Sequence, residues 1–125
     1  MNLLTKAEMQ NLSFPDYKIE NMKFDIPNRI MEIMTNGGYL SLNGGIRLKS
    51  CRLVVKNWES IEAKLYRTQT KQWENLDASD IEKLMDICEF ECGEKIIFRG
   101  FGAKTGQWIE FIFSKAILEV EKVNE

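Results

Sequence analysis

The 125-residue sequence contains no histidine, two prolines, three cysteines and no long uninterrupted apolar segment. The absence of histidine removes the commonest general base of enzymes and a frequent zinc ligand. No segment approaches the ~20 apolar residues that a membrane-spanning helix needs, and the N-terminus lacks the pattern of a secretory signal. Three cysteines cannot all pair within one chain and do not suit a disulfide-stabilised secreted protein. We therefore expect a cytoplasmic protein without membrane association, folded as a single domain over residues 1–125.

The cysteines and carboxylates do not form a recognised catalytic or metal-binding motif. Cys88 and Cys92 share one side in either a helix or a strand, and Cys51 could approach them, but structural zinc usually has four ligands and paired C-x-x-C segments. Glutamates two residues apart, such as Glu89 and Glu91, lie on one face of a strand and are typical of a solvated surface. We therefore expect no metal, no cofactor and no enzymatic activity.

Residues 96–123 alternate apolar and polar positions on both sides of the glycine-containing loop Gly100–Gly106. This pattern is typical of consecutive antiparallel strands, so the chain is predicted to end in a β-meander. The loop invites comparison with a phosphate-binding loop, but it lacks the G-x-x-x-x-G-K-[ST] order and precedes a strand instead of a helix. We interpret it as a hairpin turn with Lys104 and Thr105 at an exposed tip.

Earlier segments show the same alternation, and in three places its phase changes. The changes follow Ile19, Leu48 and Phe113, and each predicts a bulge, a sharp bend or a strand that passes between two sheets. The fold class is therefore predicted as mainly β (α+β), an antiparallel β-roll or sandwich with meander strands and one short helix. The predicted strand segments before residue 96 are a hairpin at 17–34 and strands within 39–42, 46–55 and 61–67.

The short helix is predicted to begin at Ser79, whose spacing to Glu82 is that of a capping box. Residues 87–92 also alternate, which favours a strand after this helix. Thr5 and Glu8 have the same capping-box spacing and predict either one weak helical turn or a frayed end. The residues that would form the apolar face of the predicted helix are Ile81, Leu84, Met85 and Cys88.

Charge is unevenly distributed along the chain although the formal net charge is only −2. Residues 47–71 carry about +5 and residues 74–94 about −7, counted from their side chains. These blocks either form oppositely charged surfaces that attract partners or neutralise each other across adjacent strands. The basic block with Tyr66 and Trp58 would suit single-stranded nucleic acid, but an acidic chain makes nucleic acid an unlikely partner.

Tryptophan and arginine mark a second candidate surface. If Ile109 faces the core, Trp108 and Glu110 face the other way, and Arg99 lies on the preceding strand. Tryptophan and arginine dominate binding hot spots, although a sheet covered on both faces would place Trp108 in the core instead. Trp58 and Trp73 have the same two interpretations, and any of the three could stack on a small ligand or carbohydrate.

Three segments together resemble small stand-alone bacterial proteins, among them immunity proteins of contact-dependent and polymorphic toxin systems. They are Asn57-Trp-Glu-Ser-Ile61, Ile87-Cys-Glu-Phe90 and the stretch from Gly100 to Phe111. The resemblance extends from about Tyr17 to the C-terminus. It implies a cytoplasmic protein that binds one cognate toxin and blocks its active site or substrate entry.

We therefore expect a non-enzymatic protein-binding module, most specifically an immunity protein whose cognate partner could be a basic toxin. The alternative is a small-ligand or carbohydrate-binding β domain that uses exposed tryptophans. The oligomeric state stays open because exposed edge strands can be covered by a second copy or by a partner. The candidate partner-binding residues are Asp86, Glu89, Glu91, Glu94, Arg99, Trp108 and Glu110.

Overall fold

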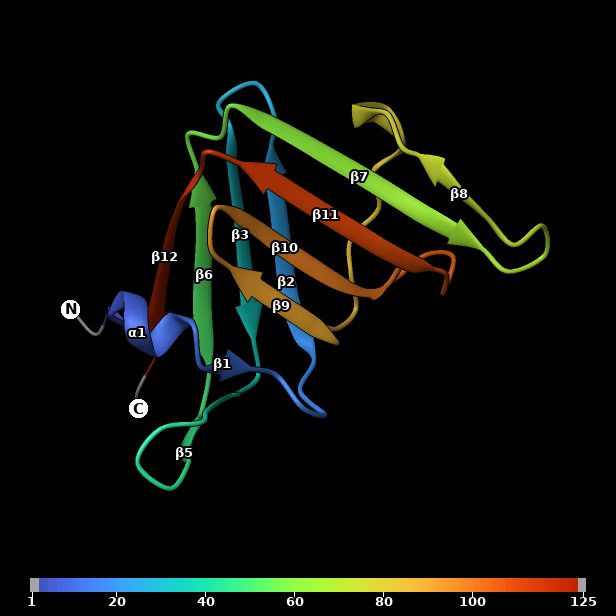
Figure 1. Ribbon diagram of the computed structural model, residues 1–125. Coiled ribbons are helices and arrows are strands. Elements are labelled where there is room, and N and C mark those ends of the chain that lie inside the picture. The colour runs from blue at the N-terminus through green and yellow to red at the C-terminus, as the bar shows by residue number, and fades with distance from the viewer. Residues whose placement is uncertain (1–2, 124–125) are drawn as a thin grey trace.

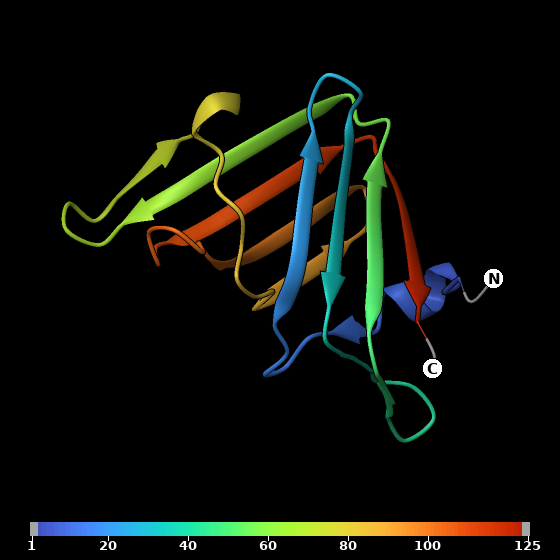
Figure 2. The ribbon, with the colours of Figure 1, turned by 180° about the vertical axis from the view of Figure 1, so that it is seen from behind.

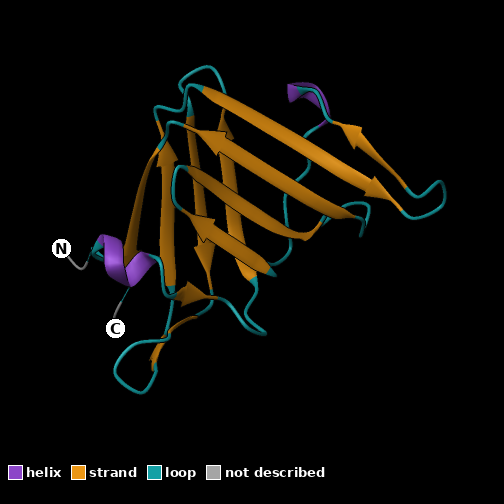
Figure 3. Cartoon of the chain, in the orientation of Figure 1, coloured by secondary structure: helices purple, strands orange, loops and turns teal. Residues whose placement is uncertain are grey.

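The computed structural model describes residues 3–123, apart from the side chain of Ala78, and these residues form mostly antiparallel β structure (Figures 1 and 3). The predicted mainly β fold class is confirmed. The elements of this part of the chain are α1 (Lys6–Met9), β1 (Leu12–Ser13), β2 (Ile19–Asp25), β3 (Ile30–Thr35), β4 (Gly38–Leu40), β5 (Ile46–Leu48), β6 (Cys51–Lys56), β7 (Ser60–Arg67), β8 (Gln72–Asn75), the 3-10 helix η1 (Ala78–Asp80), β9 (Glu89–Cys92), β10 (Lys95–Phe101), β11 (Trp108–Ser114) and β12 (Ile117–Lys122).

The described strands form two large sheets and one small sheet. The order in the five-stranded sheet is β8-β7-β11-β10-β9, and in the four-stranded sheet it is β12-β6-β3-β2. Figures 1 and 2 show these two sheets as the front and back layers of a sandwich. The three-stranded sheet, β1-β4-β5, lies at one end of the sandwich.

The core lies between the two large sheets and is made from every second residue of their strands. Phe98, Phe111 and Phe113 are fully buried on the five-stranded sheet, and Met31 and Leu53 are fully buried on the four-stranded sheet. Burying each such side chain contributes about 1.5–3 kcal/mol of hydrophobic stabilisation. The predicted alternation along β10 and β11 is confirmed by their burial patterns.

The three predicted phase changes correspond to one bulge and two changes of sheet. The register between β2 and β3 shifts between Ile19 and Asn21. After Leu48 the chain leaves the three-stranded sheet for the four-stranded one, and after β11 it leaves the five-stranded sheet for the four-stranded one. At the two sheet changes, the shift in the apolar alternation keeps the apolar side chains turned to the core after the chain enters the other sheet.

The two large sheets are connected twice at one corner, by the β6–β7 and β11–β12 connections (Figure 1). Each connection contains one residue with left-handed backbone, Asn57 (φ 57°) and Lys115 (φ 52°). Trp58 is buried in the first connection. The backbone N–H of Glu59 donates to the carbonyl oxygen of Ser114 at 2.9 Å, which ties the two connections together.

The predicted helix beginning at Ser79 is wrong. The chain forms only the 3-10 helix η1 at this point, and residues 81–88 then form no helix. The side chains of Leu84 and Ile87 do reach the core. The α-helix of the described chain is α1, where Thr5 and Glu8 form both hydrogen bonds of a capping box. None of the described helices is long and apolar enough to cross a membrane.

Residues 81–88 are extended because their backbone groups bond to the edges of both large sheets. Met85 donates its N–H to the carbonyl of Phe101 at 2.9 Å and accepts the N–H of Ile19 at 3.0 Å. Cys88 donates to the carbonyl of Arg99 at 2.8 Å. These long-range bonds satisfy the groups that a helix would pair internally, so tertiary contacts override the local helical pattern.

Residues 81–88 lie so close to strand β10 that position 100 must be a glycine. A Cβ built on Gly100 would overlap the backbone carbonyl oxygen of Asp86. A Cβ built on Gly93, by contrast, would meet no atom within 4 Å. The two glycines of the β9–β10 hairpin therefore provide a matched pair of positions, one crowded and one open.

We predict that Gly100→Ala lowers the free energy of unfolding by about 1–3 kcal/mol, because the added methyl group displaces the backbone of residues 81–88. Gly93→Ala should change it by less than about 0.5 kcal/mol, as for most open surface sites. Urea unfolding followed by tryptophan fluorescence measures both values. Equal effects of the two substitutions would contradict a close approach of the Asp86 backbone to Gly100.

Candidate binding surface

The outer face of the five-stranded sheet is turned away from the four-stranded sheet, and no described element lies over it in Figure 1. Because Ile109, Phe111 and Phe113 of β11 point into the core, Trp108 and Glu110 point outward, which is one of the two orientations that the sequence left open for Trp108. The same alternation places outward residues on the other four strands. Two groups of side chains dominate this outer face, one charged and one aromatic.

The charged group is the Arg99 cluster, formed by Arg99, Glu89, Glu91 and Glu110. Arg99 on β10 lies directly opposite Glu110 on β11 and Glu89 on β9. Its Nε lies 2.5 Å from Glu110, and its Nη1 lies 2.6 Å from Glu91 and 3.2 Å from Glu89. The hydrogen bond to Glu110, followed by the bond to Glu91, raises the pKa of Arg99 above its usual range. One guanidinium thus forms ion pairs with three carboxylates, so the cluster has a formal charge of −2.

The aromatic group is the aromatic row, which crosses four neighbouring strands and consists of Trp73, Tyr66, Trp108 and Phe101. Trp73 is the register partner of Tyr66, Tyr66 of Trp108, and Trp108 of Phe101. The ring centroids of Tyr66 and Trp73 are 5.3 Å apart and those of Phe101 and Trp108 are 5.2 Å apart, both edge to face. Trp73 is 51% exposed and Phe101 38% exposed. At about 4.8 Å between strands, the row is about 14 Å long.

Five of the seven predicted binding residues lie together on the outer face, namely Glu89, Glu91, Arg99, Trp108 and Glu110. Asp86 lies elsewhere and holds structure together, because its carboxylate accepts the N–H of Phe101 at 3.0 Å and lies 3.9 Å from Lys18. Glu94 is exposed in the β9–β10 turn. Sequence reasoning did not single out Phe101 and considered Tyr66 only as part of the basic block, since only the cross-strand register shows that both extend the row from Trp108.

The three tryptophans have different environments. Trp58 is 3% exposed and its ring lies 5.0 Å from that of Phe113, so the interpretation of Trp58 as a ligand-stacking residue is wrong. The requirement to fill the corner between the sheets explains its burial. Trp108 is half-buried at the outer face, and Trp73 is the most exposed of the three.

The oppositely charged blocks of the sequence meet at the β7–β8 hairpin, where Arg67 pairs with Glu74 across the strands. Glu82 of the acidic block has a structural use. Its carboxylate accepts the backbone N–H groups of Lys104 and Thr105, each at 2.9 Å, and the hydroxyl of Thr105 at 2.8 Å. The glycine-containing loop is therefore a hairpin turn, as predicted, and it holds a carboxylate of its own chain.

The cysteines are free thiols within the described chain. Burial raises the pKa of Cys51 to about 11, and burial followed by the nearby Asp86 carboxylate raises the pKa of Cys88 to about 11. Both thiols therefore stay protonated near neutral pH, which makes them poor nucleophiles. Among residues 3–123, no group of three or more cysteine, aspartate and glutamate side chains is arranged to hold a metal ion.

Comparison with protein-family models, with curated proteins and with solved structures finds no match to this chain. The outer face must therefore be interpreted from its own chemistry. It combines an exposed aromatic row, a shared guanidinium and excess carboxylate on one sheet.

We predict that Arg99→Met lowers the free energy of unfolding by about 1–3 kcal/mol, because it leaves three carboxylates without their shared cation. Adding Glu110→Gln to this variant should restore part of the loss, since Glu110 is the least exposed of the three carboxylates. Urea unfolding of the two variants and of Glu110→Gln alone provides the double-mutant cycle.

The matched control is Lys64→Met on the neighbouring strand β7. Lys64 makes a loose ion pair with Glu62 at 3.8 Å, and such surface pairs contribute about 0–1 kcal/mol. Strictly additive effects in the cycle, or a loss in Lys64→Met as large as that in Arg99→Met, would show that the Arg99 cluster has no special role.

Proposed function

We propose that this chain is a non-enzymatic protein-binding module that acts in the cytoplasm. In its most specific form it is an immunity protein that binds a cognate bacterial toxin and neutralises it. The observation that carries the proposal is the uncovered outer face, where the aromatic row lies beside the Arg99 cluster. The immunity role also rests on the resemblance of three sequence segments to small bacterial immunity proteins.

The composition of the outer face favours a protein partner. Tryptophan, tyrosine and arginine are the residue types that contribute most to binding hot spots. Tyr66 and Trp108 are register partners here, and Arg99 is the register partner of Glu110, two residues along β11 from Trp108. The two edge-to-face ring pairs of this row offer large apolar contact with little side-chain freedom to lose on binding. Exposed aromatic groups of this kind on one sheet are typical of interaction surfaces.

The charges beside the row favour a partner with a basic surface. The Arg99 cluster carries a formal charge of −2, and its two outer carboxylates, Glu89 and Glu91, are more than half exposed. Partner lysine or arginine side chains could pair with these carboxylates while Arg99 keeps them in place. Complementary charge of this kind speeds association and selects the partner.

We predict that Trp73→Ser weakens binding of the cognate partner at least about tenfold, because it removes the most exposed ring of the aromatic row. Partners are first captured from lysate of the source organism on the wild-type protein and identified by mass spectrometry. The Kd of the purified partner is then measured for wild type and variant. Expression of the partner alone should arrest bacterial growth, and co-expression of the wild-type protein should restore it.

The matched control is Ile117→Ser on β12. Ile117 is 47% exposed, close to the 51% of Trp73, but it belongs to the four-stranded sheet. This control should bind and protect like wild type, whereas Trp73→Ser should protect poorly. A partner that is not toxic would remove the immunity role, and equal binding by both variants would remove the outer face as the interface.

The aromatic row also supports a second candidate function, the binding of a carbohydrate chain. Its length of about 14 Å corresponds to about three sugar rings, and exposed aromatic rings with nearby polar groups are the usual components of such sites. The edge-to-face packing of the rings favours the protein partner, because it leaves fewer ring faces open for stacking.

If the row binds a glycan, titration with a panel of soluble oligosaccharides should change the tryptophan fluorescence of wild type and Ile117→Ser in a saturable manner. Trp73→Ser should lose most of this response because its ring would form part of the stacking platform. The absence of saturable changes across the panel, together with stoichiometric capture of one protein, would decide in favour of the protein-binding module.

A further inference from the structure

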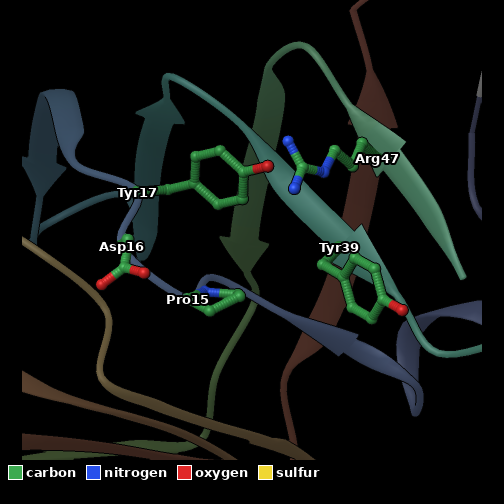
Figure 4. Close-up of a pocket in the computed structure, with 5 residues that line it drawn as sticks. All are labelled: Pro15, Asp16, Tyr17, Tyr39 and Arg47. Atoms are coloured by element: carbon green, nitrogen blue, oxygen red, sulfur yellow. The ribbon is translucent and has the colours of Figure 1, made fainter.

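A cleft of about 380 Å³ lies beside the three-stranded sheet, away from the outer face described above. Figure 4 shows its lining residues, Pro15, Asp16, Tyr17, Tyr39 and Arg47. They come from the β1–β2 connection, from β4 and from β5. The volume falls within the range of pockets that hold small molecules, about 300–1,000 Å³.

The register of the small sheet fixes the position of two of these residues. Tyr39 on β4 lies directly opposite Arg47 on β5, so both side chains project from the same face of this sheet. The opposite face carries Leu40 and Leu48, which are buried in the core. The tyrosine and the arginine therefore stand side by side on the side of the sheet turned away from the core.

The side chains of both tyrosines pack directly against a glycine. A Cβ built on Gly37 would overlap the ring of Tyr17, and a Cβ built on Gly45 would overlap the hydroxyl oxygen of Tyr39. The rings thus lie directly against the backbone, where a larger residue would displace them. This contact orders the walls of the cleft before any ligand binds, which lowers the entropy cost of binding.

The polar side-chain groups of the cleft have no partner within residues 3–123. The guanidinium of Arg47 makes no hydrogen bond or ion pair with another described residue, and neither do the hydroxyl groups of Tyr17 and Tyr39. In Figure 4 the hydroxyl of Tyr17 points toward the guanidinium, the carboxylate of Asp16 points away from it, and Pro15 and Tyr39 lie on either side below. The guanidinium of Arg47 and the hydroxyl of Tyr17 therefore lie close to each other in this view, with the rings of Pro15 and Tyr39 below them.

We propose that this cleft binds a small molecule with one carboxylate and a planar apolar body. The carboxylate accepts hydrogen bonds from the guanidinium of Arg47 and from the hydroxyl of Tyr17, and the planar body packs between Pro15 and Tyr39. A guanidinium matches the geometry of a carboxylate with two parallel N–H donors. The site uses none of the outer-face residues, so it is independent of the proposed function.

A carboxylate suits the cleft better than a phosphate group. Phosphate sites usually combine several cations with backbone N–H groups that converge on the anion. The cleft offers Arg47 as the cation among its lining residues, and Asp16 adds a negative charge at its rim. The guanidinium of Arg47 compensates a singly charged anion, since the carboxylate of Asp16 points away from it, whereas a doubly charged anion would keep one uncompensated charge beside Asp16.

The test uses benzoate as the probe and two-dimensional ¹H–¹⁵N NMR of the full chain as the readout. Benzoate should bind saturably with a Kd on the order of 1 mM, as expected for a ligand of this size, and shift the amide signals of the β4–β5 region. Benzamide, which lacks the charge, and acetate, which lacks the ring, should each bind at least about tenfold more weakly.

Two variants separate the roles of the charge and the hydroxyl. Arg47→Gln should weaken benzoate binding at least about tenfold, and Tyr17→Phe, which keeps the ring, should weaken it about threefold to tenfold. Lys23→Gln removes one positive charge from β2 and should bind benzoate like wild type. The dispersion of the NMR spectrum shows directly that each variant is folded.

The proposal is overturned if wild type shows no saturable shifts at about 20 mM benzoate, far above the expected Kd. Equal binding by wild type and Arg47→Gln would also overturn it. Tighter binding of phenyl phosphate than of benzoate would replace the carboxylate by a phosphate group as the recognised anion.

Discussion

The arrangement of both large sheets depends on the corner at which β6 continues into β7 and β11 into β12. Trp58 fills this corner, with its ring 5.0 Å from that of Phe113, and its carbonyl accepts a hydrogen bond from the guanidinium of Arg29 at 3.2 Å. Because both connections pass through the corner, it sets where β7 begins and where β11 ends, and therefore the register between these two strands. The cross-strand neighbours on the outer face follow from that register. A slip of one residue would turn Phe111 toward solvent and Trp108 toward the core, so the corner also specifies which side chains form the outer face.

The core dictates which positions face outward, but it does not dictate their chemistry. With Ile109 and Phe111 inside, Trp108 and Glu110 must lie outside, whatever residues occupy these positions. Polar side chains in place of Trp73 and Phe101 would leave the core unchanged, since both lie on the solvent side. Four aromatic residues in one row are therefore not explained by packing between the sheets. The proposed contact with a partner would explain them, because burial of these rings on association would add hydrophobic stabilisation that folding alone does not provide.

Local patterns in the sequence predicted most of the strands but missed β1 and β8. The phase changes after Leu48 and Phe113 predicted the passages between sheets because alternation responds directly to burial. The capping-box spacing at Ser79 failed because Glu82 bonds to the glycine-containing loop about twenty residues later. Trp58 and Trp108 could not be distinguished, since both follow polar segments and only the fold places one in a corner and the other on a face. The cleft at Arg47 combines three separate segments, so no local pattern indicated it.

The acidic stretch between Glu74 and Glu94 carries less free charge than its composition suggests. Glu82 and Asp86 accept backbone N–H groups, and Glu89 and Glu91 share Arg99. Charges used in this way fix the loops and strands around the outer face and leave a diffuse negative potential in place of a dense acidic patch. In the proposed function, such a potential would orient an approaching basic partner and speed its encounter, but exposed ion pairs contribute little binding energy in water. The aromatic row has the opposite character, because its contribution begins only when water is excluded from the rings. In the proposed function, the carboxylates of the outer face would therefore guide the partner from a distance, and its aromatic side chains would supply the affinity once the two surfaces are in contact.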